Sequence, residues 1–526
     1  MSEVLSVVKR ALQHALQTTR DLSARAPGTV TVQVLCIGAT VCLVGRYLLK
    51  KRYRLPPGPS ALPLIGNLPT IAYGKDPLYI TLSRLTEKYG PAITVYFGPV
   101  PCVMLNRADV VTEALVQRGG DFSGRPFLYS LGIMSNGFRN ILFSSDSRAW
   151  KIHRKIAVQA LRHYMSGPRM EEVLHNVVSK AIDKMAAERG PLDPHSLTMI
   201  LMFVMIDMFC FAGNKELDDP KLEQLRDMFE KLTTEAGNGF LEDIIPPLRY
   251  FPTKKFRKFV DRLNQFSAYI YEQIDQHRRT FSRDNMRDIT DSILLAQMEA
   301  EQEEESDDIQ FFTNIHVGQT VADLFGGGVD TSRMTLDWGL YYLASFPEVQ
   351  KRMQAELDAV TGSRLPGCAD RTKLPYTEAT LYEILRLGSV TPLSVPHRTL
   401  SDTSVGGYEV PKDTMVMINL WALSRDPKHW DQPDAFRPER FLDSEGKLIP
   451  RPESFMPFSV GRRSCLGEIV AKPELLLIFA CIVKRLTLSL APGFVFDSKP
   501  LNTSMIMHLP QPYKMVVSER SPGERV

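Results

Sequence analysis

The stretch Pro457–Glu468, PFSVGRRSCLGE, places one cysteine, Cys465, in a turn built from glycines and arginines. An apolar run, LLLIFACIV (475–483), follows it and is typical of a buried helix. A thiolate that binds haem iron must be deprotonated, directed at the metal and shielded from water. Glycines let the backbone approach the sulfur, and N–H groups there can donate to it. The stretch therefore predicts a haem-thiolate turn; a buried structural cysteine is the alternative.

The turn resembles the signature of the cytochrome P-450 superfamily, and five other motifs of that family are present in the family's order. Any one of them is weak, since Glu-x-x-Arg also occurs as a solvated i,i+3 pair. Together they identify the chain as a member of the family over roughly residues 50–518. The five motifs are PPGP at 56–59, WKIHR at 150–154, GGVDT at 327–331, EILR at 383–386 and PERF at 438–441.

The resemblance implies a mainly α fold with a smaller β region, the cytochrome P-450 fold of the microsomal type. It implies haem b (iron protoporphyrin IX) as cofactor and O2 as cosubstrate. Electrons would come from NADPH through NADPH–cytochrome P-450 reductase, with cytochrome b5 as an optional second partner. One oxygen atom would enter a lipophilic small molecule, and the other would leave as water. The haem would do the chemistry, and the protein would supply orientation and control of water.

Composition agrees with one large globular enzyme. The 526 residues are 44% hydrophobic, enough for a sizeable core, and the net charge of +3 gives no indication of nucleic-acid binding. The seven cysteines are scattered and odd in number, without a Cys-x-x-Cys pair. This pattern favours a reducing compartment over a disulfide framework or a zinc site.

The N-terminal part predicts a membrane anchor. Residues 29–45 carry no charge, and a basic cluster, Lys50-Lys51-Arg52, follows. We expect one transmembrane helix over 29–49 with the body on the cytosolic side of the endoplasmic reticulum. A mitochondrial presequence within 1–28 is the alternative. The expected organisation is an extension (1–28), the anchor (29–49), a basic and proline-rich hinge (50–60), the haem domain (61–518) and a flexible tail (519–526).

Within the haem domain, residues 93–106 predict two strands joined at a Gly-Pro turn. Residues 122–146 are loop-rich and, by resemblance, contact substrate, whereas 148–290 are mostly helical. A helix over roughly 309–343 would be about 50 Å long, enough to cross the molecule.

Three consecutive glycines, 326–328, interrupt that helix pattern and should destabilise it by about 1 kcal/mol each relative to alanine. Close helix packing is one explanation. The other is a groove, at Gly327 and Gly328, opened over a flat cofactor to admit dioxygen. Asp330 and Thr331 follow directly, and an alcohol supplied by a carboxylate can deliver protons to bound oxygen. We expect Asp330 and Thr331 to be catalytic.

Two further groups of residues follow from the resemblance. Glu383, Arg386 and Arg440 are expected to form a buried ion-pair triad that holds the cysteine turn, a structural role. The two haem propionates would be neutralised by Trp150, Arg154, His397 and Arg463, with Phe458 covering the sulfur and Gly467 in the turn. For His397 an ordinary structural histidine is the alternative.

A positive face near Cys465 would suit an acidic flavoprotein electron donor. Its expected members are Lys151, Lys155, Arg162, Arg462, Lys472 and Lys484, with scattered solvated lysines as the alternative. Pro473, inside the helix after the cysteine, departs from the family pattern and should kink that helix.

The substrate class is mixed in the sequence. LFGGGVDTS, INLWALSRDP, RRSCLGEIV and DIIPPLRYFP resemble the steroid 17-alpha-hydroxylase/17,20-lyase group, whereas FSGRPFLYSL, RKIAVQALR and MRDITDSIL also resemble the aryl-hydrocarbon-hydroxylating group. The first expectation is a steroid, and the alternative is a planar aromatic or xenobiotic substrate. A reductase-independent isomerase and a non-catalytic haem or steroid-binding protein are rivals. By resemblance, Phe325, Val395 and Ile506 would line the substrate pocket.

Overall fold

The computed structural model describes residues 53–63, 65–72, 76–213, 215–302, 308–501, 504 and 506–521. The chain divides into two compact units, Met1–Arg54 and Leu55–Val526. The expected extension (1–28) and anchor (29–49) lie outside the described residues, as does most of the tail. The hinge is described from Tyr53 onward.

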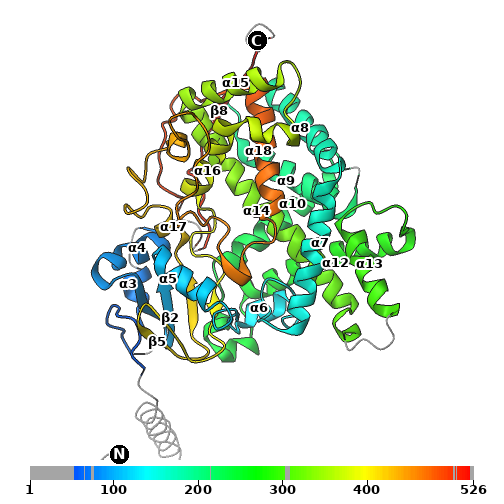
Figure 1. Cartoon of the computed structure of the whole chain (residues 1–526). Coiled ribbons are helices and arrows are strands. Elements are labelled where there is room, and N and C mark those ends of the chain that lie inside the picture. The colour runs from blue at the N-terminus through cyan, green and yellow to red at the C-terminus, as the bar shows by residue number, and fades with distance from the viewer. Residues whose placement is uncertain are drawn as a thin grey trace, which may run out of the picture. The chain divides into compact units, whose positions relative to one another are not determined.

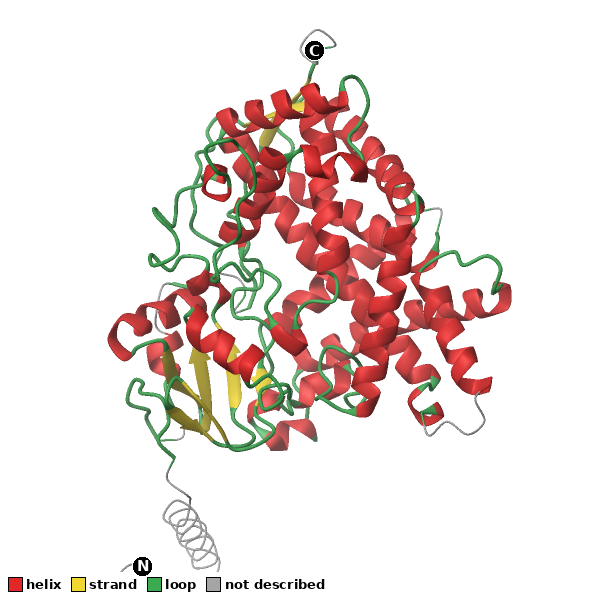
Figure 2. Ribbon diagram, viewed as in Figure 1, coloured by secondary structure: helices red, strands yellow, loops and turns green. Residues whose placement is uncertain are grey.

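The second unit is mainly helical with a smaller sheet region, as predicted (Figures 1 and 2). Its helices are α3 (Leu68–Ala72), α4 (Leu78–Tyr89), α5 (Ala108–Thr112), α6 (Tyr129–Met134), α7 (Arg148–Ser166), α8 (Arg169–Ala187), α9 (Pro194–Phe211), α10 (Pro220–Gly237), α11 (Leu241–Ile244), α12 (Lys254–Thr280), α13 (Ile289–Gln302), α14 (Asn314–Ser345), α15 (Pro347–Thr361), α16 (Pro375–Gly388), α17 (Leu420–Leu423) and α18 (Glu468–Arg485).

The predicted strand pair is present as a hairpin. Strands β1 (Ala92–Phe97) and β2 (Val100–Leu105) meet at Gly98, whose φ of 60° suits glycine. They belong to a four-stranded sheet of order β1-β2-β6-β3, in which β6 (Met415–Ile418) runs parallel to β2 and β3 is His397–Arg398. Two separate hairpins pair β4 (Thr403–Val405) with β5 (Tyr408–Val410), and β7 (Leu486–Leu490) with β8 (Met515–Glu519).

The long helix α14 lies in the middle of the helical region (Figure 1). It begins at Asn314, later than predicted, because the Thr313 hydroxyl accepts a hydrogen bond from the His316 N–H and caps it. Residues Ile309–Phe311 form a separate 3-10 turn. The helix continues through the three glycines to Ser345, and most of its second half is buried.

Helix α9 is the one helix among the described residues that is long and apolar enough to cross a membrane. It is a core helix, because fifteen of its eighteen residues are buried. It packs against α8, α10 and α14. Its uniform apolarity therefore reflects burial on every side within the body.

Helix α18, which follows the cysteine turn, is also buried on most sides. It continues through Pro473 to Arg485, although Pro473 has no N–H to donate to the Ile469 carbonyl. Helices α8, α14, α15 and α16 pack against α18, so neighbouring elements hold it in place where its own hydrogen bonding is weakest.

Candidate active site

A cavity of about 1100 Å³, including its opening, lies between α7, α14 and α18 and is bounded by the cysteine turn. Eight residues singled out from the sequence line it together. They are Arg154, Gly327, Gly328, Thr331, Phe458, Arg463, Cys465 and Gly467. The rest of the lining is largely apolar and includes Leu142, Leu324 and Ile206. The cavity is thus the place where the predicted haem-binding and oxygen-activating residues meet.

The cysteine turn is fixed by its backbone. The Cys465 N–H donates to the Phe458 carbonyl over 3.0 Å. Gly461 has a φ of 77°, and a Cβ there would lie 2.0 Å from the carbonyl oxygen of Leu115. Only glycine fits such a position. A substitution at Gly461 would therefore displace the turn that carries Cys465.

The Cys465 side chain is exposed, and the surface it exposes is the wall of the cavity. Surrounding protein raises the pKa of its thiol through desolvation, whereas hydrogen bonds from the N–H groups of Gly467 and Glu468 and the charge of Arg154 act in the opposite direction. These N–H groups stand at the start of α18, where the helix dipole also favours a negative charge. The turn is built to carry a thiolate once a metal replaces the proton.

Three guanidinium groups surround the cavity: those of Arg125, Arg154 and Arg463. Arg463 donates to the carbonyls of Ser123, Ile141 and Ser144, and Arg154 donates to that of Ser464 over 2.6 Å. Burial and the repulsion of neighbouring arginines lower the pKa of Arg125 to about 9 and that of Arg463 to about 8. Within the described part of the chain none of the three forms an ion pair with a carboxylate. A buried cluster of unpaired cations fits a cofactor with two carboxylates, such as haem.

Arg125 was not foreseen from the sequence, although it lies in the FSGRP stretch. It donates to the carbonyls of Leu142, Val395 and Pro396 and so joins the loop after α5 to the strand region. We expect Arg125→Met to lose haem to apomyoglobin about tenfold faster, because a charged hydrogen bond is worth about 1.5–3 kcal/mol. The matched control is Arg107→Met, an arginine paired with exposed Asp109. An unchanged rate of haem loss would contradict the role of Arg125.

Trp150 and His397, which were expected to contact the propionates, are absent from the cavity lining. The Trp150 indole N–H donates to the Ile141 carbonyl over 3.1 Å, and the guanidinium of Arg463 lies 4.0 Å above its ring. His397 is buried, pairs through Nδ1 with the Phe122 carbonyl over 2.8 Å, and is absent from the cavity lining. Burial and the charge of Arg125 lower the pKa of His397 to about 3, so it is a neutral imidazole. The Trp150 ring packs against Arg154 and Arg463, two of the arginines around the cavity.

On α14, Thr331 lines the cavity, whereas Asp330 does not. The Thr331 hydroxyl lines the cavity and donates to the Gly327 carbonyl over 2.7 Å. A Cβ at Gly327 would meet nothing within 4 Å, whereas one at Gly328 would lie 2.8 Å from Ile206. The lack of a side chain at Gly328 therefore permits close packing against Ile206, whereas Gly327 borders the open space of the cavity. Asp330 is buried behind this face, outside the lining, and desolvation raises its pKa.

The ion-pair triad is present and buried. The Glu383 carboxylate accepts from Arg386 at 2.7 Å and 2.8 Å and from Arg440 at 3.0 Å. The backbone N–H of Arg437 donates to the same carboxylate. Arg386 also donates to the carbonyls of Ser424 and Pro433, so the triad fastens α16 to the long loop that leads to the cysteine.

The three residues expected from the resemblance to line the substrate pocket, Phe325, Val395 and Ile506, remain a prediction. None of them is among the residues that line the cavity. Phe325 is fully buried in an aromatic cluster with Phe203 and Phe211. The Val395 carbonyl accepts from Arg125, and Ile506 is partly exposed beside Gly237 at the end of α10. The residues that face the cavity from α14 are Asp323, Leu324, Gly327, Gly328, Thr331 and Ser332.

Asp323 is a lining residue that the sequence reasoning missed. Its carboxylate accepts from the N–H groups of Ile141 and Leu142 and from the Asn140 amide at 2.7–2.9 Å. Burial raises its pKa to about 6 in spite of these bonds. Asp323 thus ties the loop at residues 140–142 to α14. Its spacing of eight residues from Thr331 was a usable signal, because such positions lie near one helical face.

Four of the six residues expected to form the positive face are exposed. Lys472 and Lys484 are buried; Lys472 pairs with Glu468, and Lys484 pairs with Asp358 over 2.6 Å. The exposed members are Lys151, Lys155 and Arg162 on α7, and Arg462. Lys151 and Arg462 share the carboxylate of Asp146 at 3.5 Å and 2.9 Å.

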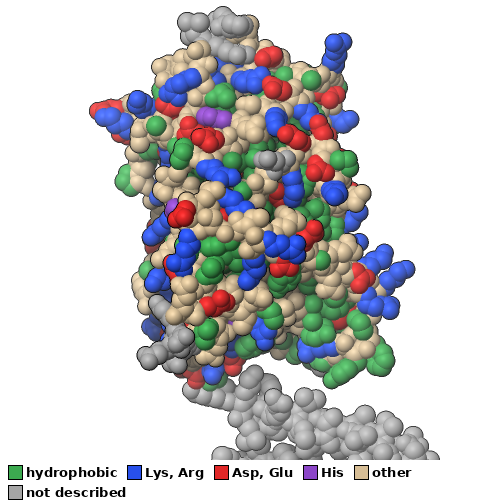
Figure 3. Space-filling model, turned by 90° about the vertical axis from the view of Figure 1, so that its right-hand side faces the viewer, with side chains coloured by type: hydrophobic (Ala, Val, Ile, Leu, Met, Phe, Trp, Pro, Cys, Tyr) green, Lys and Arg blue, Asp and Glu red, His purple; other side chains and the backbone are tan. Residues whose placement is uncertain are grey.

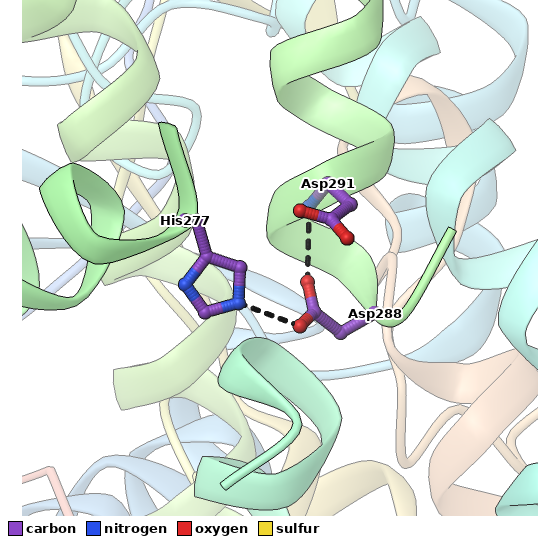
Figure 4. A group of neighbouring side chains, drawn as sticks. All are labelled: His277, Asp288 and Asp291. Atoms are coloured by element: carbon purple, nitrogen blue, oxygen red, sulfur yellow. Dashed lines mark hydrogen bonds and ion pairs between the residues drawn. The ribbon is translucent and has the colours of Figure 1, made fainter. Parts of the chain in front are cut away.

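A second cluster, His277, Asp288 and Asp291, has the composition of a metal site (Figure 4). Its ligand atoms are already engaged. His277 bonds the Gln273 carbonyl through Nδ1 and Asp288 through Nε2, and Asp291 accepts two bonds from the Arg287 guanidinium. The contact with Asp288 raises the pKa of His277 against the effect of burial. The cluster is a hydrogen-bonded junction between α12 and α13.

Comparison with known proteins agrees with this geometry. The family model described as cytochrome P450 matches residues 56–517. Cytochrome P450 1A1 of Cavia porcellus is 35% identical over 486 residues, covering 90% of this chain and 93% of the relative. Cytochrome P450 1A1 of Oryzias latipes is 36% identical over 484 residues, covering 88% and 91%. Cytochrome P450 1A5 of Gallus gallus is 34% identical over 509 residues, covering 93% and 95%.

The site defines a haem-thiolate protein, and the chain belongs to the cytochrome P450 family. Members are monooxygenases, oxidoreductases that use haem, O2, a redox partner and a small-molecule substrate. The expectation of a steroid substrate is not supported, because these relatives are of the 1A type. They favour the aryl-hydrocarbon-hydroxylating alternative.

Proposed function

We propose that this monooxygenase hydroxylates planar aromatic or other xenobiotic lipophiles, with electrons from NADPH delivered by NADPH–cytochrome P450 reductase. The observation that carries the oxygen chemistry is that Cys465 and Thr331 line one cavity together with three buried arginines. The substrate class is supported by the 1A-type relatives and by the largely apolar lining. Fold alone does not decide a substrate, so the cavity and the relatives have to be weighed together.

When bound, the haem would supply the reactive metal and accept the electrons. Cys465 would supply the sulfur that holds its iron, and Arg125, Arg154 and Arg463 would neutralise its propionates. Phe458 lies at the sulfur side of the cavity, where it helps to exclude water. Thr331 would hold a proton at its hydroxyl on the cavity wall, and Asp330 would be the acid that resupplies it.

Thr331→Ala should raise hydrogen peroxide release per NADPH consumed about fivefold or more, because positioned proton donors contribute at least that much. Peroxide and product are measured together during turnover. Thr331→Ser should restore most of the coupling, since it keeps the hydroxyl. Thr335→Ala is the control, because the Thr335 hydroxyl donates to the Thr331 carbonyl one turn further along and is absent from the lining. Unchanged coupling in Thr331→Ala would refute the proton-delivery role.

The reductase would dock on the exposed basic residues Lys151, Lys155, Arg162 and Arg462. An acidic flavoprotein surface is their natural complement, and its association rate should fall with ionic strength. Cytochrome b5, also acidic, could use the same surface as a second electron donor.

The proposed location is the endoplasmic reticulum membrane, through the anchor at 29–49, with the catalytic body cytosolic. An exposed apolar group between α10 and α12 supports contact with a lipid surface. Its members are Leu241, Ile244, Tyr250 and Phe251, of which the two aromatic residues are more than 80% exposed. Figure 3 shows apolar side chains gathered toward the lower edge of one face, with acidic and basic side chains mixed above them. Import into mitochondria is the alternative.

An optical titration tests the substrate class. We expect a planar polycyclic aromatic to displace the axial water and shift the Soret band to the blue at about tenfold lower concentration than progesterone, a difference of about 1.4 kcal/mol. Both ligands are added to the purified ferric protein. Tighter binding of progesterone would return the proposal to steroids, and no shift with any aromatic would reject the proposed class.

A further inference from the structure

A line of charged side chains leads from Asp330 through α14 to the surface at α9 and α10. The Asp330 carboxylate is buried, and its polar neighbours are Arg333, with Nε 3.5 Å from Oδ1, and the Thr233 side chain of α10. Arg333 is itself buried, one turn along α14. The pKa of a buried carboxyl group falls when a positive charge lies close to it. The pKa of Asp330 therefore depends on its distance from Arg333.

Arg333 is held at its other end by Asp337. Its Nη1 donates to Asp337 Oδ2 over 2.8 Å, and Thr198 of α9 donates to the second Asp337 oxygen. His195, in the first turn of α9, reaches the same Asp337 oxygen through Nδ1 at 3.2 Å. Arg333 and His195 therefore compete for one carboxylate.

His195 is the solvent-exposed end of the line. Its side chain is 43% exposed, and Nε2 pairs with Glu230 of α10 at 2.9 Å. The hydrogen bond to Asp337, followed by that to Glu230, raises the pKa of His195 to about 9. The hydrogen bond with His195 lowers the pKa of Glu230.

The two protonation states of His195 place different demands on Arg333. Nδ1 of His195 lies 3.1 Å from Nη1 of Arg333. When His195 is charged, Nδ1–H donates to Asp337 and repels the guanidinium, which leaves Arg333 available to Asp330. When His195 is neutral with its proton on Nε2, the Nδ1 lone pair accepts from Arg333 and holds it away from Asp330.

We propose that His195, acting through Asp337 and Arg333, is a positioning residue that sets the readiness of Asp330 to release its proton. The inference deepens the proposed oxygen chemistry and rests on it. Arg333 does not carry the proton, because its guanidinium stays charged. It acts as a movable counter-charge whose distance from Asp330 depends on the charge of His195.

Other charged groups also lie near His195. Glu230 and Arg226 face it from α10, and Asp337, Arg333 and Asp330 from α14. Asp193 caps α9 and accepts from the His195 backbone N–H, not from its ring. Tyr513 donates its hydroxyl to the Asp337 carbonyl over 2.8 Å and leaves the carboxylate free.

Proton delivery from Asp330 should become slower as the pH rises. Below pH of about 9 His195 is charged, Arg333 is free to approach Asp330, and the pKa of Asp330 is held down. Above it Arg333 is withdrawn, Asp330 holds its proton more firmly, and delivery slows. Coupling of NADPH oxidation to product should therefore show a step near pH 9 in the wild-type protein.

The test compares wild type, His195→Gln and His429→Gln between pH 6.5 and 9.5. His429 is an exposed histidine outside this network. We expect His195→Gln to release about threefold more peroxide per NADPH at pH 7.5 and to lack the step, with melting temperature as the check on folding. A wild-type profile in His195→Gln would overturn the proposal. If no variant, wild type included, oxidises NADPH with substrate, the proposed function fails instead.

A second readout does not depend on turnover. The ring C–H resonance of His195, assigned by its loss in His195→Gln, is titrated in the ferrous carbon-monoxide form. Asp330→Asn removes a negative charge next to Arg333, so the pKa of His195 should fall by about one unit. An unchanged pKa would show that the two ends of the line are not linked and would overturn the inference.

Discussion

Cys465→Ala abolishes the reduced carbon-monoxide Soret band of thiolate-ligated haem. The reason is that alanine removes the sulfur which, among the cysteines of the described residues, combines exposure to the cavity with N–H donors at the start of a helix. Without it the haem would be held by its propionate contacts alone, and monooxygenase turnover should drop below detection. The measurement is the difference spectrum of the dithionite-reduced protein with and without carbon monoxide.

Cys210 is the informative control, because it is the second cysteine that lines the cavity. It sits within α9, where burial and the charges of Asp288 and Asp207 raise its pKa well above the usual range. A thiol in such surroundings stays protonated. Cys210→Ala should therefore keep the band. A band that survives Cys465→Ala and disappears in Cys210→Ala would overturn the ligand assignment.

Glu383→Ala is expected to destabilise the haem domain by about 3–5 kcal/mol, because it leaves two buried arginines without their carboxylate. Arg386 is fully buried, and the Arg440 side chain is 5% exposed. The same change removes the acceptor of the Arg437 N–H, so the loop before the cysteine loses its attachment to α16. Urea denaturation followed by the Soret band and by circular dichroism measures both effects.

Glu348→Ala is the matched control. Glu348 and Lys351 form an ion pair at 3.0 Å, with 80% and 68% of their side chains exposed. Such surface pairs contribute about 0–1 kcal/mol. If Glu383→Ala is no more destabilising than Glu348→Ala, the triad does not hold the fold in the way argued.

The cysteine turn and the triad could be predicted because short stretches of sequence carry them. Gly461 and Gly467 are turn residues at fixed distances from Cys465, and Glu383 and Arg386 lie three apart on one helix. Arg125 could not be found this way. It enters the cavity from a loop more than 300 residues before the cysteine, and tertiary packing alone brings it there.

Four of the α14 residues that line the cavity could be predicted from helical phase. Positions 324, 327, 328 and 331 follow the i, i+3, i+4, i+7 spacing of one helical face, and all four line the cavity. Phe325 lies about 100° around the helix from Leu324 and is fully buried in the core. Asp330 is likewise about 100° from Thr331 and faces α10.

Lys472 and Lys484 were expected at the surface because they are charged, but both are buried. Helix α18 is covered on most sides, so Lys484 pairs with the buried Asp358 and Lys472 pairs with the partly buried Glu468. A pattern of charges cannot indicate burial unless the neighbouring helices are known, and these come from distant parts of the chain.

The most direct test of the central claim uses isotopic oxygen. The purified protein, a flavoprotein reductase, NADPH and a planar aromatic substrate are incubated under ¹⁸O2, and the product is analysed by mass spectrometry. The account predicts one ¹⁸O atom in each hydroxylated product molecule and the other in water. Product oxygen derived from solvent, or an aromatic-stimulated NADPH oxidation that yields no labelled product, would contradict it.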